Sequence, residues 1–360
     1  MRNSLFWLIS AFYFCFFAII GVYVIYMPKV LQLHGYTSWQ IGLIFALSPL
    51  MRFLTPFLFL RHLQLTQPLY RLSLLLGLLA GGLFFSTINN FWLFMIPNIL
   101  LGISFALSLP FVETIALATI GKERYGRSRL FGSLGFIVVA LLLARWMDDP
   151  QITLWTLLIT LVMTTIVGLF IQSEHHFDSP KQKAFNLFKE WRLWVNILLM
   201  QISFGPFYNF FTIYESERGV DYTTISYLWT FGVVAEIIML FFQAPLLRKN
   251  LLWIIALCTF AAAVRWLLIF LFPTSLAILF FAQSLHALSF ALYYSAVISY
   301  LFAAYTNKTL AQQFFGGISF GLGGMLGSLF AGIAYGEYLF FYASLVALAA
   351  FLVLVLKPAH

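Results

Sequence analysis

Apolar runs of about 20 residues, separated by short polar stretches, recur along the whole chain. A helix that crosses ~30 Å of hydrocarbon needs about 20 mostly apolar residues, and twelve segments meet that requirement. They are expected at 5–27, 38–60, 72–88, 91–119, 130–146, 151–172, 192–214, 223–246, 251–272, 275–304, 309–334 and 338–356. Because these runs are continuously apolar and do not alternate, they predict helices and exclude a membrane β-barrel.

The composition agrees with a lipid environment. Hydrophobic residues make up 62% of the chain and charged residues 9%, with a mean hydropathy of +0.95, whereas soluble proteins carry roughly 25% charged residues. A soluble enzyme, a nucleic-acid-binding protein and a disordered protein are therefore excluded. The net charge of +8 does not indicate nucleic acid, because the basic residues lie in short loops between apolar runs.

These loop charges predict the orientation of the chain. With the N-terminus in the cytoplasm, fifteen Lys and Arg residues fall on the inside and three, Lys29, Arg145 and Arg218, on the outside. The inside set is Arg2, Arg61, Arg71, Lys122, Arg124, Arg127, Arg129, Lys181, Lys183, Lys189, Arg192, Arg248, Lys249, Lys308 and Lys357. Basic residues concentrate on the cytoplasmic side of membrane proteins, so both termini are expected there.

No cofactor or metal is implied by the sequence. Cys15 and Cys258 lie inside apolar segments, where cysteine acts as a small packing residue. His175 and His176 are adjacent on a polar stretch and lack the further ligands that a metal site needs. Phosphate-binding loops and hydrolase motifs are also missing from the sequence, which argues against an ATP-driven pump or a membrane-embedded enzyme.

The chain divides near its centre. The longest polar stretch, 173–190, is expected to be a cytoplasmic linker between an N-terminal six-helix bundle, 1–172, and a C-terminal six-helix bundle, 191–360. Three helix pairs match across this linker: 35–52 with 219–236, and 131–136 with 315–320, at an offset of 184 residues, and 104–107 with 289–292 at an offset of 185.

Two halves of six spans in the same orientation indicate parallel repeats. This is the architecture of the major facilitator superfamily of secondary transporters, with a central cavity between the halves. The eleventh span also contains Gly317-x-x-x-Gly321 and Gly323-x-x-x-Gly327, a spacing that lets helix backbones approach closely. Static packing and a moving interface both explain these glycines.

Five ionisable residues lie inside the expected spans: Arg52, Glu113, Glu236, Arg265 and His286. An Arg or acid at mid-membrane costs roughly 2.5–3.5 kcal/mol on insertion scales, so the four Arg and Glu residues would cost about 10–14 kcal/mol unpaired. They must therefore face a cavity, pair with one another or be neutral. An ionisable residue within a membrane span is by default a candidate functional residue.

Depth along the spans groups these residues. Arg52 and Glu113 reach a similar depth in the N-terminal half, so a pair between them is possible. Glu236, Arg265 and His286 lie on three successive spans. Glu236, His286 and Glu113 are candidates for proton coupling, and Arg265 or Arg52 is suited to hold a substrate carboxylate. Buried ion pairs that only fix helix register remain the alternative.

The segments that carry these charges resemble one known family. The sequences GVVAE (232–236), VRW (264–266), SLHALSF (284–290) and RLFGSLGF (129–136), together with Arg52, are similar to the phenylpropionate permease family, a branch of the major facilitator superfamily near the lactose and nucleoside permeases. Glu236, Arg265, His286 and Arg52 match charged positions of that family. Glu113 departs from it, because it stands where an Asp is usual.

The resemblance implies a monomeric proton symporter of the bacterial inner membrane that takes up a small organic acid such as 3-phenylpropionate. The expected partners are this acid, protons and the lipid bilayer, without nucleic acid. Uptake of a neutral sugar or nucleoside, with the charges serving only coupling, is one alternative, and efflux by antiport is another, because a sequence does not set direction.

Overall fold

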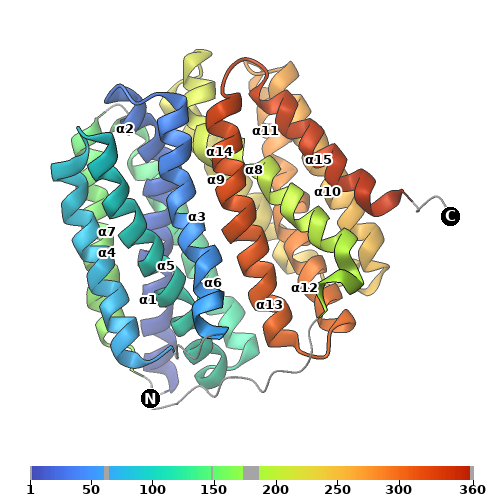
Figure 1. The fold of residues 1–360 in the computed structure, drawn as a ribbon, viewed down its shortest axis with the longest axis horizontal. Coiled ribbons are helices and arrows are strands. Elements are labelled where there is room, and N and C mark those ends of the chain that lie inside the picture. The colour runs from blue at the N-terminus through green and yellow to red at the C-terminus, as the bar shows by residue number, and fades with distance from the viewer. Residues whose placement is uncertain (1, 61–64, 147–148, 173–185, 357–360) are drawn as a thin grey trace. The chain divides into compact units, whose positions relative to one another are not determined.

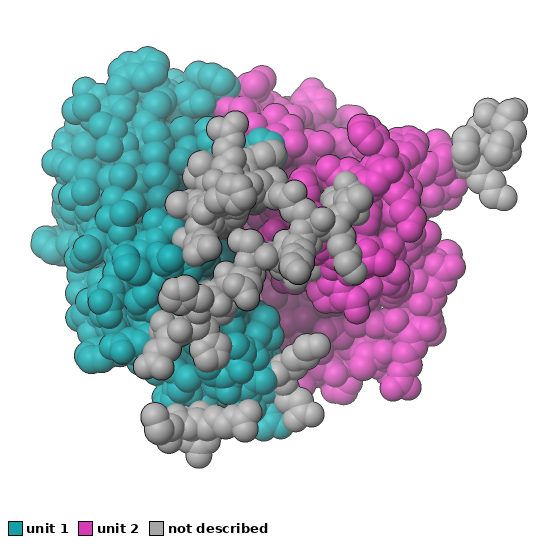
Figure 2. Space-filling model, turned by 60° about the horizontal axis from the view of Figure 1, so that its bottom comes forward, with its two compact units in different colours: residues 1–179 teal, residues 180–360 magenta. Residues whose placement is uncertain are grey.

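The computed structural model describes residues 2–60, 65–146, 149–172 and 186–356, and within these ranges the regular structure is entirely helical (Figure 1). Most of the predicted linker, 173–185, lies outside the described residues, as do four of the basic residues assigned to the inside, Arg61, Lys181, Lys183 and Lys357. The chain forms two compact units, residues 1–179 and 180–360, coloured teal and magenta in Figure 2.

The first unit contains six apolar helical stretches. The first stretch is a continuous run of three segments, of which the middle one is a π-helix. In chain order the elements are α1 (Arg2–Gly21), η1 (Val22–Tyr26), α2 (Met27–Leu33), α3 (Ser38–Leu60), α4 (Gln67–Thr87), α5 (Phe91–Thr119), α6 (Lys122–Leu142), η2 (Ala144–Trp146) and α7 (Pro150–Leu169).

The second unit repeats this plan. Its elements are η3 (Leu187–Glu190), α8 (Trp191–Glu217), α9 (Tyr222–Phe242), η4 (Leu246–Arg248), α10 (Leu251–Leu271), α11 (Leu276–Ser284), η5 (Ala287–Leu292), α12 (Tyr293–Ala304), α13 (Lys308–Gly316), η6 (Gly317–Gly323), α14 (Gly324–Ala334) and α15 (Leu339–Val355). Two π-helical segments, η5 and η6, interrupt the fourth and fifth stretches of this unit.

The helices confirm the twelve predicted spans. Among the described residues, nine stretches are long and apolar enough to cross a bilayer by length and composition, and α15 is a shorter apolar helix. Short polar side chains cap several of them: Asn90, Asp149, Asp221 and Asn250 each accept a backbone N–H from the first turn, which satisfies donors that the helix itself leaves free. At Asp221, outside the span, the hydrogen bond from the Thr224 hydroxyl, followed by that from the Thr224 backbone N–H, holds the carboxyl pKa below its usual range.

One predicted boundary is wrong by about two turns. The fifth span was expected to begin at residue 130, but α6 begins at Lys122. The apolar run does start late, but a helix continues through charged residues wherever these find solvent or partners. Gly121, with a φ of 79°, starts the helix, and Arg129 therefore lies on α6 and not in a loop.

The two units share one set of helix neighbours. In the first unit α1 packs on α6 and α7, and α5 packs on α3 and α4. In the second unit α8 packs on α14 and α15, while α11 and η5 pack on α9 and α10. The equivalent helices therefore have equivalent neighbours, and the internal repeat predicted from the sequence is confirmed within each unit.

Glycine allows the closest of these helix crossings. A Cβ added at Gly135 of α6 would collide with the Phe14 carbonyl of α1, and one added at Gly205 of α8 would collide with the Gly327 carbonyl of α14. Gly323 is also confined, since its Cβ would lie 2.8 Å from the Cβ of Gln201. The second predicted glycine pair, Gly323 and Gly327, thus lies against α8, where small residues let two backbones touch.

Candidate functional site

The centre of the candidate site is Arg265, which α10 places in the interior of the second unit. Its side chain is 0% exposed. The guanidinium carbon lies 4.3 Å from the ring centre of Phe207 and 5.8 Å from that of Phe204, both on α8. A desolvated cation over an aromatic face gains about 2 kcal/mol or more, which offsets part of the cost of burying this charge.

Three side chains accept hydrogen bonds from the Arg265 guanidinium. Nη1 lies 2.8 Å from His286 Nδ1 and donates to Ser289 Oγ at 3.4 Å, and Nη2 donates to Gln283 Oε1 at 2.7 Å. The third nitrogen, Nε, has no hydrogen-bond partner. All three acceptors are uncharged groups from the α11–η5 region, so the cation is held by dipoles.

No acidic side chain within the described ranges forms an ion pair with Arg265. The acid of this unit, Glu236 on α9, instead approaches His286, with Oε2 lying 3.6 Å from Nε2. His286 therefore stands between the acid and the arginine. The structure thus brings together three residues predicted from the sequence, Glu236, Arg265 and His286, in the order acid, imidazole, guanidinium.

Hydrogen-bond chemistry fixes the tautomer of His286 in this arrangement. An arginine only donates, so Nδ1 of His286 must accept from Arg265 and carries no proton. The neutral ring then carries its proton on Nε2, the nitrogen that faces Glu236. The ring of Phe290 stacks on the imidazole at 5.0 Å with an interplanar angle of 9°, which holds the ring plane in place.

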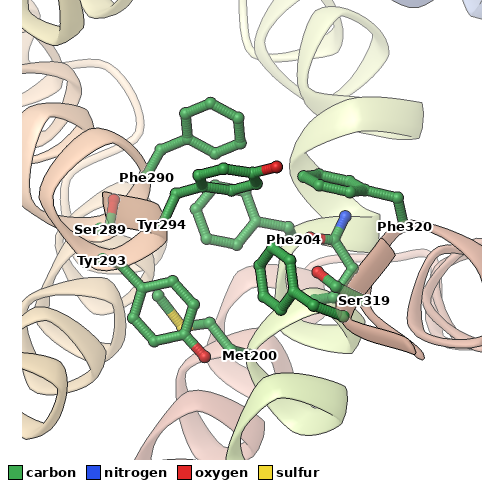
Figure 3. Close-up of a pocket in the computed structure, with 10 residues that line it drawn as sticks. Met200, Phe204, Ser289, Phe290, Tyr293, Tyr294, Ser319 and Phe320 are labelled. Carbon is green, nitrogen blue, oxygen red and sulfur yellow. The ribbon is translucent and has the colours of Figure 1, made fainter. Parts of the chain in front are cut away.

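An aromatic pocket adjoins this charged group. Figure 3 shows the rings of Phe204, Phe290, Tyr294 and Phe320 gathered around it, with Ser289 and Ser319 at its edge. The full lining is Met200, Gln201, Phe204, Ser289, Phe290, Tyr293, Tyr294, Phe315, Ser319 and Phe320. Ser289 also contacts Arg265, so the apolar pocket and the buried cation share a wall.

Two π-helical segments supply opposite parts of this wall. Ser289 and Phe290 belong to η5, and Ser319 and Phe320 belong to η6. A π-helical turn holds one extra residue, which changes the direction in which the following side chains point, and such segments are frequent at functional sites. His286 directly precedes η5. The pocket therefore depends on a local helix geometry that hydrophobic periodicity does not predict.

The first unit contains a separate charged cluster. Glu113 of α5 forms an ion pair with Arg129 of α6, at 2.5 Å between Oε1 and Nη1, and Tyr125 donates to the same oxygen at 3.4 Å. The guanidinium of Arg129 lies 4.7 Å from the ring centre of Phe17. The ion pair of Glu113 is thus formed with Arg129, and the suggested partner, Arg52, does not make it.

Arg52 lies in the neighbourhood of this cluster without joining the ion pair. Its charge interacts with those of Glu113 and Arg129, and its guanidinium carbon lies 5.7 Å from the ring centre of Phe105. The predicted Arg52–Glu113 pair is wrong. It rests on the similar depth of the two residues along their spans, whereas α6 begins early enough to place Arg129 next to the Glu113 carboxylate. Arg52 is therefore a cation that takes no part in the Glu113–Arg129 ion pair, the one described in this unit.

Sequence reasoning missed Gln283 and Arg129. Arg129 was assigned to a loop because it precedes the apolar run. Gln283 carries no charge, so it did not stand out within an apolar span, although it lies one helical turn before His286. A polar residue three positions from a predicted site residue is the signal that could have identified it.

The chain matches the model of the MFS_1 like family over residues 6–346. It is 26% identical to a protein of Escherichia coli (strain K12) named "Probable 3-phenylpropionic acid transporter", over 94% of each chain. It is 25% identical to the "Uncharacterized transporter YwbF" of Bacillus subtilis (strain 168), over 79% of this chain and 73% of that one.

Solved transporter structures share the fold. The nucleoside transporter NupG superposes with a TM-score of 0.78 at 15% identity, covering 98% of this chain and 100% of that chain. A bacterial homologue of the iron transporter ferroportin, in an inward-facing state, superposes with a TM-score of 0.76 at 11% identity, covering 98% of each chain. At such identities the likeness establishes the fold alone.

Proposed function

The chain belongs to the MFS_1 like family and is a multi-pass membrane transporter of the major facilitator fold, and from this premise we propose that it takes up a small aromatic carboxylate together with a proton. A substrate of the 3-phenylpropionate type fits the site best. The proposal places the carboxylate at Arg265 and the proton at the Glu236–His286 pair. Movement across the bilayer follows by alternating access, as in other secondary transporters.

The observation that carries this proposal is the missing counter-ion of Arg265. The guanidinium is fully buried, has a free Nε–H, and has no acidic partner in the part of the chain that the structure describes. A buried cation without an anion is unfavourable unless an anion arrives. A substrate carboxylate supplies that anion and binds a planar guanidinium through two parallel hydrogen bonds.

The neighbouring pocket favours an aromatic acid over an aliphatic one. Rings of Phe204, Phe290 and Tyr294 line it, and offset stacking or edge contacts with a substrate ring gain about 0.5–1.5 kcal/mol each beyond area burial. Because Ser289 borders both the pocket and Arg265, a ring bound among these side chains and a carboxylate on Arg265 would be neighbours, as they are in an acid with a short chain between the two groups.

Charge balance favours symport. With Glu236 ionised, the net charge of the empty site is zero, although His286 lies between the two groups and Glu236 does not contact Arg265. A bound carboxylate adds one negative charge in a region where uncompensated charge is expensive. One proton taken up on Glu236 restores neutrality, and His286 connects that acid to the arginine at 3.6 Å and 2.8 Å. Substrate and proton therefore stabilise each other's binding, as symport of the two in the same direction requires.

Glu113 and Arg52 are the corresponding candidates in the first unit. We assign Glu113 to proton coupling, because its ion pair with Arg129 is partly exposed and a carboxylate exchanges protons more readily when water reaches it. Arg52, outside that ion pair, is available as a second cation for an anionic substrate. The membrane is expected to be a bacterial inner membrane, with both termini cytoplasmic and a monomer as the working unit.

The direct test is uptake of radiolabelled 3-phenylpropionate into cells that express the protein, with and without a protonophore. We expect accumulation that collapses when the protonophore dissipates the proton gradient, since one proton moving through 100 mV releases about 2.3 kcal/mol. Cells that carry the empty vector are the control for passive entry of the acid.

Other results would change the assignment in defined ways. Accumulation that persists with the protonophore would contradict proton coupling and leave the substrate in place. Uptake of a neutral nucleoside or sugar without uptake of the acid would overturn the carboxylate assignment of Arg265. Accumulation that is lower in expressing cells than in control cells would indicate efflux.

A further inference from the structure

Gln283 is the residue of this site that no charge pattern identified. It lies on α11, is 0% exposed, and its Oε1 accepts from Arg265 Nη2 at 2.7 Å. Because arginine only donates, the carbonyl end of the amide must face Arg265 and the amino end must point elsewhere. That amino group, Nε2, has no hydrogen-bond partner.

The site therefore holds more donors than acceptors. Arg265 Nε and Gln283 Nε2 are both buried N–H groups without a partner, and the only acceptors for the guanidinium are His286 Nδ1, Ser289 Oγ and Gln283 Oε1 among the described residues. Buried donors without acceptors are rare in folded proteins and call for a ligand that accepts hydrogen bonds. A carboxylate offers about four acceptor positions and no donor.

The unpartnered groups also define where a carboxylate would bind. Nε and Nη2 of an arginine point along the same edge of the planar guanidinium, and a carboxylate binds such an edge through both its oxygens. On Arg265, Nη2 already donates to Gln283 Oε1, and Nε has no partner. The other nitrogen, Nη1, is already engaged by His286 and Ser289.

We propose that Gln283 is a specificity-determining residue whose carbonyl oxygen holds the place of a substrate carboxylate oxygen on Arg265 in the empty site. An arriving carboxylate displaces that oxygen from Nη2 and takes the free Nε–H. The displaced amide then turns its N–H toward the bound acid. This inference rests on the proposed function, because it assumes that an anion binds Arg265.

The neutral charge of Gln283 is the essential feature. A glutamate at this position would form a permanent ion pair with Arg265 and exclude an anionic substrate. A carboxylate can displace the amide oxygen from the arginine, because a hydrogen bond between a charged and a neutral group is weaker than a buried bidentate ion pair. The residue type therefore selects acids over neutral ligands.

The test compares the full-length wild-type protein with Gln283→Glu, purified in detergent. Without ligand, we expect Gln283→Glu to raise the melting temperature, because it supplies the counter-ion that Arg265 lacks. Its affinity for 3-phenylpropionate should fall at least about tenfold, while its affinity for the neutral 3-phenylpropanamide should change less than about threefold. The readout is the ratio of the affinities for 3-phenylpropionate and 3-phenylpropanamide, because a loss of folded protein alone would not change this ratio.

Matched variants define the controls. Gln312→Glu makes the same change at an exposed position of α13 and should leave both ligand affinities and the melting temperature near their wild-type values. Combining Gln283→Glu with Arg265→Met should abolish the gain in melting temperature. Gln283→Asn keeps a neutral amide and should keep the preference for the acid over the amide ligand. It is the variant to compare with wild type if Gln283→Glu is unstable.

Two outcomes would overturn the inference. One is wild-type affinity for 3-phenylpropionate in Gln283→Glu, and the other is an equal loss of affinity for the acid and the amide. Failure of the proposed function looks different: the wild-type protein then binds no aromatic carboxylate. In that case the inference holds for another anion only if Gln283→Glu raises the melting temperature and Arg265→Met abolishes that gain. The inference is wrong if the melting temperature of Gln283→Glu falls or stays unchanged.

Discussion

At the scale of single residues, the proposed function gives the two charged ends of the Glu236–His286–Arg265 group different tasks, the proton at Glu236 and the substrate at Arg265. His286 accepts from the arginine through Nδ1 and presents Nε2 to the acid, so a second ring proton would break the contact with Arg265. Glu236 is more exposed than His286, with 18% of its side chain accessible against 8%. We therefore propose that Glu236 exchanges the proton, while His286, whose Nε2–H faces this acid, stays neutral and links the acid to Arg265.

The first prediction concerns Glu236→Gln. A glutamine mimics the protonated acid and cannot release a proton, so we expect accumulation of 3-phenylpropionate to be lost. Exchange of internal for external substrate should persist, because it needs no net proton transfer. Uptake and counterflow in proteoliposomes measure the two activities, with Glu337→Gln at an exposed position as the control. Equal loss of both activities would count against Glu236 as the coupling acid.

The second prediction concerns Arg265→Lys. Lysine keeps the charge but lacks the planar fork, so it cannot satisfy His286, Gln283 and a carboxylate at the same time. We expect transport at saturating proton gradient to fall at least about tenfold, a loss of about 1.4 kcal/mol. Arg248→Lys, on an exposed residue, should transport normally, and normal transport by Arg265→Lys itself would remove this residue from the site.

At the scale of helices, the same crossing recurs in both units. Gly135 on α6 and Gly205 on α8 each lie against a carbonyl group of a neighbouring helix, and neither site has room for a methyl group. The crossing of α8 with α14 also positions the pocket, because Gln201 and Phe204 extend from α8 on the same stretch as Gly205.

The third prediction follows from that crossing. Gly205→Ala should destabilise the protein by about 1–3 kcal/mol, the usual cost of overpacking, and lower its melting temperature in detergent. Gly82→Ala is the matched control, because a Cβ at this helical position of α4 meets nothing within 4 Å, and alanine is the better helix former by up to about 1 kcal/mol. A melting temperature for Gly205→Ala at or above wild type would show that the helices separate at little cost.

At the scale of the whole molecule, orientation in the bilayer is set by basic residues. On the predicted inside, Arg71 and Lys308 lie near the N-terminal ends of α4 and α13 and Arg248 ends the short helix η4, and on the predicted outside Arg218 follows α8. Orientation follows such differences in Lys and Arg content between the two sides. This argument applies to the chain as it inserts, before any tertiary contact forms.

The fourth prediction tests that orientation. A fluorescent protein fused to the C-terminus should be fluorescent, because it folds only in the cytoplasm, and an alkaline phosphatase fused at the same point should be inactive. An internal comparison is a phosphatase fusion truncated after Gly219, between α8 and α9, which should be active. The reverse pattern would place both termini outside.

The sequence alone determined the twelve spans, the repeat of six helices and the identity of the five intramembrane charges. Each of these depends on local quantities: the length of an apolar run, the periodicity of the chain and the cost of a charge in hydrocarbon. The limits 91–119 agree with α5 residue for residue, because Asn90 caps its start, and the expected start at residue 38 agrees with that of α3.

Only the tertiary structure decided which groups meet. Glu113 pairs with Arg129 instead of Arg52, His286 separates Glu236 from Arg265, and Gln283 accepts a hydrogen bond from Arg265 Nη2. These choices depend on how helices rotate and where π-helical turns occur, and a shift of one residue turns a side chain by about 100°. Hydrophobic periodicity is weak in helices that are apolar on every side, so the sequence leaves that rotation open and packing fixes it.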